Sequence, residues 1–213
     1  MHKLKIMDLE LHWNTAYENS NTEKLGWYED SPEPSLQLIK KCKFDKDARL
    51  LNVGVGATTL IDELIKLGYK NIIGSDISSI AVEKIKERIG PASDLVKWII
   101  DDLTNPKKLI DLPTVDLWND RAVLHFFNDT WDQDAYFSLL KKLVKPNGFV
   151  IIAAFNLSGA IKCSGLPVFR YSKEMLEERL GYDFQCLDSF NFTYTMPGGD
   201  ERPYIYTLFQ RTK

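Results

Sequence analysis

Residues 49–60 read Arg-Leu-Leu-Asn-Val-Gly-Val-Gly-Ala-Thr-Thr-Leu, and this stretch carries the strongest fold signal in the chain. An apolar run ends in two glycines, Gly54 and Gly56, and a helical pattern follows at once. That order predicts a strand, a tight turn and a helix start, which is how α/β proteins hold a nucleotide-like ligand. Turns that bind a pyrophosphate carry a third glycine, whereas residues 57–59 are Ala-Thr-Thr. The stretch therefore indicates a nucleoside ligand that lacks a pyrophosphate.

A carboxylate at the end of the next expected strand supports a nucleoside ligand. Residues 71–75 form a second strand-like run that ends on Asp76, twenty residues after Gly56. A carboxylate at this separation can accept both hydrogen bonds of a ribose diol. We therefore expect Asp76 to lie at the ribose.

Composition and charge exclude several classes of protein. The chain has 213 residues, a formal net charge of −3 and 44% hydrophobic residues, as expected for one globular domain. This charge gives no reason to expect a nucleic-acid partner, and no apolar run approaches the ~20 residues that span a bilayer. The three cysteines and three histidines show neither disulfide nor metal-ligand spacing. With no signal-peptide pattern, the sequence predicts a cytoplasmic protein without a metal site.

Strand-like and helix-like segments alternate after about residue 49, which predicts parallel βαβ units. The expected strands span residues 50–53, 71–75, 95–100, 115–119 and 149–154. The expected helices span residues 31–42, 58–67, 78–89, 132–144 and 172–180. Two aromatic, β-prone runs at 184–195 and 204–211 flank a turn sequence at 197–200, which predicts a terminal hairpin. Right-handed crossovers then place a ligand crevice at the carboxyl ends of strands 50–53 and 115–119.

Two adjacent carboxylates, Asp101 and Asp102, follow the strand expected at residues 95–100. A carboxylate there can accept from an adenine amino group, while the next backbone N–H, that of Leu103, reaches a ring nitrogen. The same carboxylates can instead cap a helix over residues 104–109. We assign the ligand role to Asp102 and the capping role to Asp101.

Residues 116–127 read Asp-Leu-Trp-Asn-Asp-Arg-Ala-Val-Leu-His-Phe-Phe and run from a strand into an expected helix at the switch point of the sheet. A carboxylate at Asp120 can steer an amine substrate or take up a proton. Arg121 can pair with a carboxylate, either Asp120 or one on a ligand. His125 falls one helical turn after Arg121 on the same face, although a lone helical histidine is more often a packed core residue.

Together these motifs resemble those of class I S-adenosylmethionine-dependent methyltransferases, over nearly the whole chain. The resemblance rests on the glycine stretch, Ser-Asp-Ile-Ser at 75–78, Asp101-Asp102, residues 118–126 and the Lys-Pro-Asn-Gly turn at 145–148. It implies a three-layer, doubly wound, Rossmann-like α/β fold with a seven-stranded, mainly parallel sheet and a C-terminal antiparallel hairpin. That family usually carries an acidic residue where this chain has Asn52, which can hold the loop but supplies no charge.

The resemblance implies that the chain moves a methyl group from S-adenosylmethionine to a nitrogen, oxygen or sulfur of an acceptor. The implied cofactor-binding residues are Asn52, Gly54, Gly56, Asp76, Ile77, Asp102, Leu103, Asp120 and Trp27. The implied catalytic residues are Asp120, Tyr17 and His125. Methyl transfer is an in-line displacement whose catalysis comes largely from positioning, so neither a metal nor a nucleophile is required.

The sulfonium of such a cofactor is a cation that suits aromatic faces, and the N-terminal segment supplies Trp13, Tyr17, Trp27 and Tyr28. We therefore expect one domain over residues 1–213, with residues 1–45 as a helical lid segment on a core at 46–213. Packing of this segment on the sheet accounts for most of the aromatics equally well.

A narrower resemblance concerns residues 163–172, Cys-Ser-Gly-Leu-Pro-Val-Phe-Arg-Tyr-Ser. This run is similar to a bacterial subgroup whose animal relatives include the mitochondrial citrate synthase lysine methyltransferase. The tail at residues 194–204 departs from that subgroup. A protein lysine and a small molecule therefore both stand as acceptors.

Two other classes remain open from the sequence. One is an NAD(P)-dependent oxidoreductase, which the missing third glycine and the terminal hairpin argue against. The other is a non-catalytic methyltransferase-like protein that binds a partner through its aromatic N-terminus. The sequence does not predict the oligomeric state.

Overall fold

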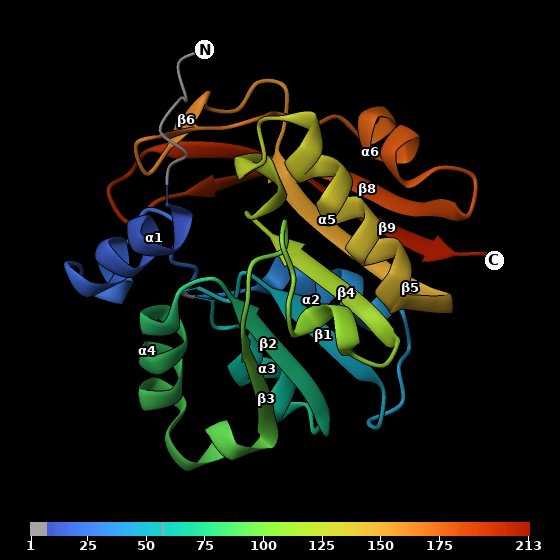
Figure 1. Cartoon of the computed structure of the whole chain (residues 1–213). Coiled ribbons are helices and arrows are strands. Elements are labelled where there is room, and N and C mark those ends of the chain that lie inside the picture. Colours follow the sequence, from blue (N-terminus) through green and yellow to red (C-terminus); the bar gives the residue numbers. More distant parts are fainter. Residues whose placement is uncertain (1–7, 57) are drawn as a thin grey trace.

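The computed structural model describes residues 8–56 and 58–213, which form a seven-stranded sheet with helices on both faces (Figure 1). Ala57 of the glycine stretch and the first seven residues of the expected lid segment lie outside the described residues. The predicted three-layer α/β fold is confirmed.

The sheet has the strand order β3-β2-β1-β4-β5-β9-β8. Its strands are β1 Arg49–Val53, β2 Asn71–Asp76, β3 Val96–Ile100, β4 Val115–Arg121, β5 Val144–Phe155, β8 Phe184–Thr195 and β9 Glu201–Arg211. Strands β1 to β5 run parallel, and β9 pairs antiparallel with both β5 and β8. The winding direction changes between β1 and β4, so a crevice opens at the carboxyl ends of these two strands.

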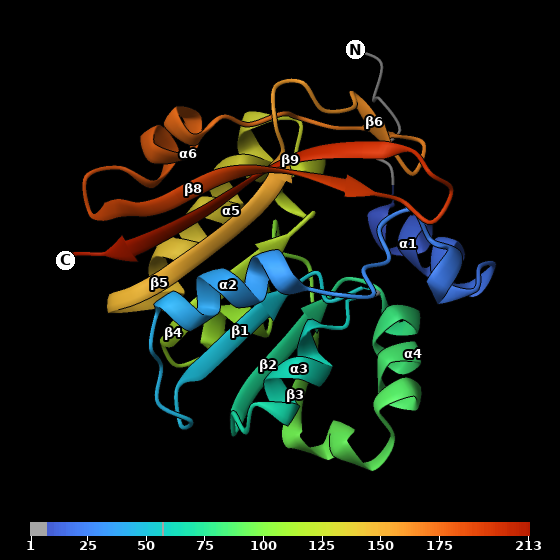
Figure 2. The ribbon, with the colours of Figure 1, turned by 180° about the vertical axis from the view of Figure 1, so that it is seen from behind.

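Helices cover both faces of this sheet. They are α1 Leu9–Glu18, α2 Glu33–Lys41, α3 Leu60–Lys66, α4 Ser79–Ile89, α5 Thr130–Leu143 and α6 Lys173–Leu180. Figure 2 shows α2 and α3 in front of the sheet and α5 behind it, while α1 lies beside α4 at the edge where the parallel strands end. A small ribbon of β6 Lys162–Cys163 and β7 Leu166–Pro167 lies at the same edge. Within the described residues, no helix is both long and apolar enough to cross a membrane.

Strand β1 is buried on both faces, as its continuous apolar run predicts. Leu50 packs in the layer that contains α2 and α3, whereas Leu51 and Val53 pack in the layer that contains α5. Successive side chains of a strand point to opposite faces, so this one strand contributes to two hydrophobic layers. Its carboxyl end, which carries the glycine turn, is thereby held rigidly.

Local capping residues set several helix ends where the sequence predicts them. Ser78 and Ser172 accept hydrogen bonds from backbone N–H groups in the first turns of α4 and α6, at 3.1 and 3.3 Å. The same helices end at Gly90 and Gly181, whose φ angles are +65° and +78°. These glycines take a left-handed conformation that other residues rarely adopt.

Two expected helix starts next to the crevice are wrong. The helix expected from residue 58 begins at Leu60, because Thr58 instead forms a parallel bridge with Glu29. Strand β4 continues through Arg121, and only a 3-10 turn, η4 Leu124–Phe126, follows it. Ala122 has a φ of +70°, which breaks the expected run from strand into helix.

Two further segments differ from expectation. The turn at residues 145–148 lies inside β5, where Asn147 takes a φ of +64°. No capped helix forms over residues 104–109: residues 104–108 form a loop, and a short 3-10 turn, η3 Leu109–Asp111, follows. The capping explanation for two carboxylates at that loop therefore needs revision.

We predict that Gly54→Ala destabilises the protein more than Gly68→Ala. Both glycines have a positive φ, of +60° and +80°, so both substitutions strain the backbone by about 1–2 kcal/mol. A Cβ on Gly54 would also overlap Cγ2 of Val123, whereas one on Gly68 meets nothing within 4 Å. Overpacking adds about 1–3 kcal/mol at the first site. Urea unfolding checks this, and equal losses in both variants would contradict it.

Candidate active site

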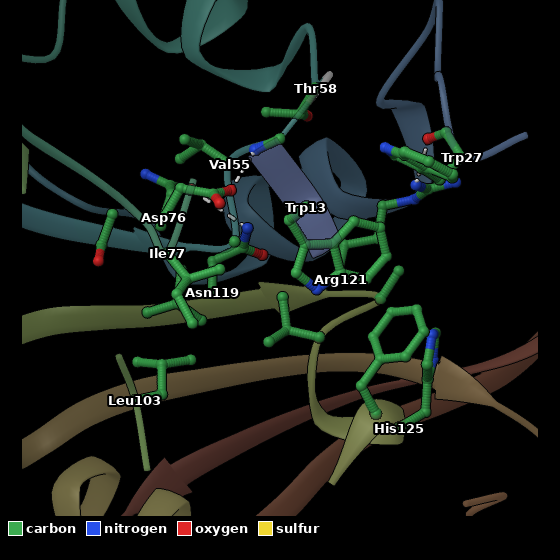
Figure 3. Close-up of a pocket in the computed structure, with 18 of the residues that line it drawn as sticks. Trp13, Trp27, Val55, Thr58, Asp76, Ile77, Leu103, Asn119, Arg121 and His125 are labelled. Carbon is green, nitrogen blue, oxygen red and sulfur yellow. Dashed lines mark hydrogen bonds between the residues drawn. The ribbon is translucent and has the colours of Figure 1, made fainter. Parts of the chain in front are cut away.

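A cleft that is partly open to solvent lies at the carboxyl ends of β1, β2 and β4. Its lining comes from α1, Trp27, the glycine turn, the ends of β2 and β3, the β4–η4 segment, Cys163 and Tyr204. Figure 3 shows Asp76, Ile77 and Leu103 at one end of this cleft and Trp27, Arg121 and His125 at the other. We call these the nucleoside end and the acceptor end.

The glycine turn of residues 54–56 is shaped by close neighbours as well as by its backbone angles. Gly54 and Gly56 have φ angles of +60° and +43°. Val123 occupies the place of a Cβ on Gly54, and the Tyr17 hydroxyl occupies that place on Gly56. Both positions of the turn therefore require glycine because neighbouring side chains leave no room for a Cβ. The sequence pattern alone does not reveal this requirement.

Asp76 joins the end of β2 to the glycine turn. Its Oδ2 accepts from the backbone N–H of Gly56 and its Oδ1 from that of Ser78, each at 2.8 Å. Burial raises the Asp76 pKa to about 6, although these backbone donors oppose the shift. Each carboxylate oxygen has two lone pairs, so both oxygens retain capacity toward the cleft.

The loop after β3 brings Asp101, Asp102 and Leu103 to the nucleoside end of the cleft. Asp101 accepts from four backbone N–H groups of this loop, at 2.8–3.1 Å. Burial acts to raise the Asp101 pKa, but these donors outweigh it and hold that pKa below its usual range. Both hydrogen bonds that Asp102 accepts from Thr104 go to Oδ1. Asp101 thus organises the loop, while Oδ2 of Asp102 takes no part in either bond.

Asn52 and Asn119 form a polar pair in the middle of the cleft. They are register partners on the parallel strands β1 and β4, and Asn119 Nδ2 donates to Asn52 Oδ1 at 3.2 Å. Among the described residues, Asn52 Nδ2 and Asn119 Oδ1 have no partner although both atoms are buried. Whichever way the two amides are turned, one shared bond leaves one NH₂ group and one carbonyl oxygen free. Asn119 is a cleft residue that the sequence interpretation missed, although alignment of the two strand ends would have paired it with Asn52.

Asp120 does not line the cleft, which corrects the expected position of this carboxylate. It is fully buried, and it accepts from the N–H groups of Val123 and Leu124 at 2.9 and 3.1 Å and from the Tyr136 hydroxyl at 2.7 Å. Burial raises the Asp120 pKa to about 6. The side chain alternation along β4 turns Asp120 toward α5, away from its neighbours in the cleft. The carboxylate thus fixes the turn between β4 and η4.

The N-terminal segment covers the glycine turn with aromatic side chains. Trp27 Nε1 donates to the Tyr17 hydroxyl at 2.7 Å. Trp13 packs edge-on against Trp27 and Phe126, with ring centroids 5.3 and 4.9 Å apart. Burial and the nearby Asp76 raise the Tyr17 pKa well above its usual value. Tyr17 therefore stays a neutral phenol.

Arg121 and His125 meet at the acceptor end, although not on one helix face as expected. Arg121 is the last residue of β4 and His125 lies in η4. The Arg121 side chain pairs through Nε with Oε1 of Glu29 at 3.1 Å. Its Nη1 donates to the backbone oxygen of Trp27, also at 3.1 Å (Figure 3). His125 stacks on Phe155 at 4.4 Å. Burial, aided by Arg121, lowers the His125 pKa to about 3, so the imidazole is neutral.

No group of three or more His, Cys, Asp or Glu side chains in residues 8–56 and 58–213 could hold a metal ion.

Comparison with known proteins then gives the cleft a chemical context. A family model described as a methyltransferase domain matches residues 51–152. EEF1A lysine methyltransferase 2 of Mus musculus is 27% identical over 185 residues, which cover 78% of this chain and 72% of that protein. The Homo sapiens protein of the same name is also 27% identical, over 78% of this chain and 75% of that protein. The chain is an S-adenosylmethionine-dependent methyltransferase.

Solved structures agree with this assignment at the level of the fold. A SAM-dependent methyltransferase from Anabaena variabilis has a TM-score of 0.76 at 14% identity, over 95% of this methyltransferase and 93% of that chain. The N-methyltransferase NodS from Bradyrhizobium japonicum, solved with S-adenosylhomocysteine, has a TM-score of 0.68 at 14% identity, over 95% and 100%. Of the three classes that the sequence left open, the methyltransferase is the supported one.

The cleft of this methyltransferase offers the polar groups that its cofactor S-adenosylmethionine needs. The amino-acid part of S-adenosylmethionine has an ammonium group that donates hydrogen bonds and a carboxylate that accepts them. The unpartnered buried oxygen and NH₂ of Asn119 and Asn52 match these two groups. Asp76 offers acceptors for a ribose diol at the carboxyl end of β2. The residues present therefore fit the cofactor, even with Asn52 in place of an acidic residue.

We predict that S-adenosylhomocysteine binds more weakly below pH 6. A ribose diol donates to ionised Asp76, whose pKa is about 6 without ligand, so protonation removes the acceptor as pH falls through that value. Titration calorimetry should show about a tenfold loss of affinity per pH unit below it. Asp76→Asn is the matched control and should lack this slope. Asp120 has a similar pKa and is still present in that variant, so an equal slope there would contradict the assignment to Asp76.

Proposed function

We propose that the methyl acceptor is an amine and that a protein lysine supplies it. The sequence relatives named above are lysine methyltransferases by name, and NodS is an N-methyltransferase. The resemblance of residues 163–172 to the subgroup related to citrate synthase lysine methyltransferase points the same way. Membership of that subgroup and a cytoplasmic location belong to this proposal.

One observation carries the proposal, namely that the His125 imidazole at the acceptor end is uncharged. Methyl transfer needs a neutral amine with a free lone pair, but a lysine amine in water is protonated at pH 7. Burial and Arg121 keep His125 uncharged by lowering its pKa to about 3. An amine placed beside His125 meets the same burial and the same cation. The surroundings therefore favour the neutral, reactive form of the acceptor.

Aromatic side chains complete the acceptor end. Trp13, Trp27 and Phe126 line the cleft in edge-to-face contact, beside the stacked ring of His125. Ring faces attract a cation such as a sulfonium. An aromatic end of this kind suits the long aliphatic stem of a lysine better than a polar metabolite.

The roles of the remaining cleft residues follow from their positions. When bound, S-adenosylmethionine supplies a methyl group on a positively charged sulfur. We assign its ribose to Asp76, its adenine to Asp102 and Leu103, and its amino-acid part to the free groups of Asn52 and Asn119. These residues would hold the cofactor so that its methyl group is presented to the acceptor. Catalysis then comes from positioning and from exclusion of water.

The N-terminal segment, residues 8–45 of the described chain, is proposed to act as the lid on this site. Asn14 accepts from the Ser78 hydroxyl at 2.8 Å, and Lys84 of α4 donates to the backbone oxygens of Tyr17 and Ser20. Thr59 donates to the backbone oxygen of Glu29 at 2.9 Å. These contacts fasten the segment on both sides of the glycine turn.

We predict that the protein transfers tritiated methyl groups into the protein fraction of a heat-treated lysate. Acid hydrolysis of that fraction should release the label as methyl-lysine. Asp76→Ala is the control and should lose most of the transfer, because the ribose loses its acceptor. Label found only in the small-molecule fraction, or released as a base-labile ester, would contradict a protein lysine acceptor.

A further inference from the structure

The acceptor end of the cleft carries a single buried ion pair, Arg121 with Glu29, among the described residues that surround it. The Arg121 side chain is 10% exposed and that of Glu29 is 4% exposed. Arg121 lines the cleft whereas Glu29 does not, so the positive end of the pair faces the acceptor. Nη2 of Arg121 is buried and has no partner within the described chain.

Among the described residues, three carboxylates line the cleft, and Figure 3 shows Asp76 at the end opposite Arg121. Asp76, Asp101 and Asp102 all belong to the nucleoside end, and each already accepts backbone hydrogen bonds. Asp120 is turned away into its own buried cluster. No carboxylate among the described lining residues thus stands beside Arg121 to take a proton from an acceptor.

The other titratable groups around Arg121 are uncharged at neutral pH. They are Tyr17 from α1, His125 from η4, Cys163 from β6, Tyr194 from β8, and Tyr204 and Tyr206 from β9. Burial raises the pKa values of the tyrosines and of the thiol, and it lowers that of His125. Burial alone would lower the Arg121 pKa, but the hydrogen bond with the Tyr206 hydroxyl and the Glu29 carboxylate raise it, so the guanidinium stays charged.

We propose that Arg121 holds the acceptor amine in its uncharged form and that Glu29 sets how strongly it does so; this inference rests on the proposed amine acceptor. The ammonium first loses its proton to water. The nitrogen lone pair then forms the N–C bond as the C–S bond breaks, and the electron pair of that bond stays on sulfur. The positive charge passes from sulfur to nitrogen, so charge and atoms balance.

A nearby cation accelerates this reaction only below the pKa of the bound amine. By lowering the pKa of the bound amine, Arg121 increases the neutral fraction by the full factor that corresponds to the pKa change. The nucleophilicity of the neutral amine falls by a smaller factor. The net rate near pH 7 therefore rises. At high pH, where the amine is neutral without help, Arg121 slows the transfer. A residue that only stabilises the fold would lower the rate at every pH.

The test is the pH profile of the rate in two variants with opposite charge changes. The probe is the lysate protein fraction, used at a concentration where the rate no longer rises, so that the profile reports the bound amine. Arg121→Gln should shift the rising limb of the pH–rate profile to higher pH by about one unit. Glu29→Gln should shift that limb to lower pH by about one unit. Arg121→Lys should keep the position of the wild-type limb, because it keeps the charge.

Two controls separate this effect from misfolding and from failure of the proposed acceptor. Arg179→Gln removes a positive charge that pairs with Asp134 on the helices α5 and α6, and its rising limb should stay at the wild-type pH. Circular dichroism and S-adenosylhomocysteine affinity verify that each variant is folded. An active wild type whose limb does not move in Arg121→Gln and Glu29→Gln overturns the inference alone. A wild type that labels no protein overturns the proposed acceptor instead.

Discussion

The hydrogen bonds of the Asp76 carboxylate hold the cleft together. Its two oxygens bind the N–H groups of Gly56 and Ser78, so one side chain joins the glycine turn, the end of β2 and the start of α4. The Ser78 hydroxyl then binds Asn14 and so connects α1 to the same point. From α1 the Tyr17 hydroxyl reaches back over Gly56. The floor and the cover of the cleft are thus parts of one connected arrangement. Burying a carboxylate is costly unless several donors compensate it, and the backbone supplies them here.

Charge divides this cleft into two parts with different chemistry. The nucleoside end gathers Asp76, Asp101 and Asp102, which suits hydroxyl and amino donors. The acceptor end gathers aromatic rings and one guanidinium, whose countercharge Glu29 lies outside the lining. Such a division favours a ligand that donates hydrogen bonds at one end and presents a neutral nucleophile at the other. It is a physical reason for methyl transfer without a metal or a covalent nucleophile.

Much of the fold and part of the site could be predicted because the signals are local. The apolar run before Gly54, the caps of α4 and α6 and the terminal hairpin all lie within short stretches of sequence. The position of Asp120 cannot be predicted from local sequence, because its partner Tyr136 lies on helix α5 and because Ala122 takes a left-handed conformation. The pair of Arg121 and Glu29 joins segments far apart in the chain. Only the tertiary structure shows that these residues meet.

The central claim is that the cleft around Asp76 holds S-adenosylmethionine with its sulfur toward Arg121. A crystal structure of the protein with S-adenosylhomocysteine tests this most directly. The account predicts both ribose hydroxyls on Asp76, the amino-acid part on Asn52 and Asn119, and the sulfur facing the acceptor end. A ligand bound elsewhere, or bound here with its ribose turned away from Asp76, would contradict it.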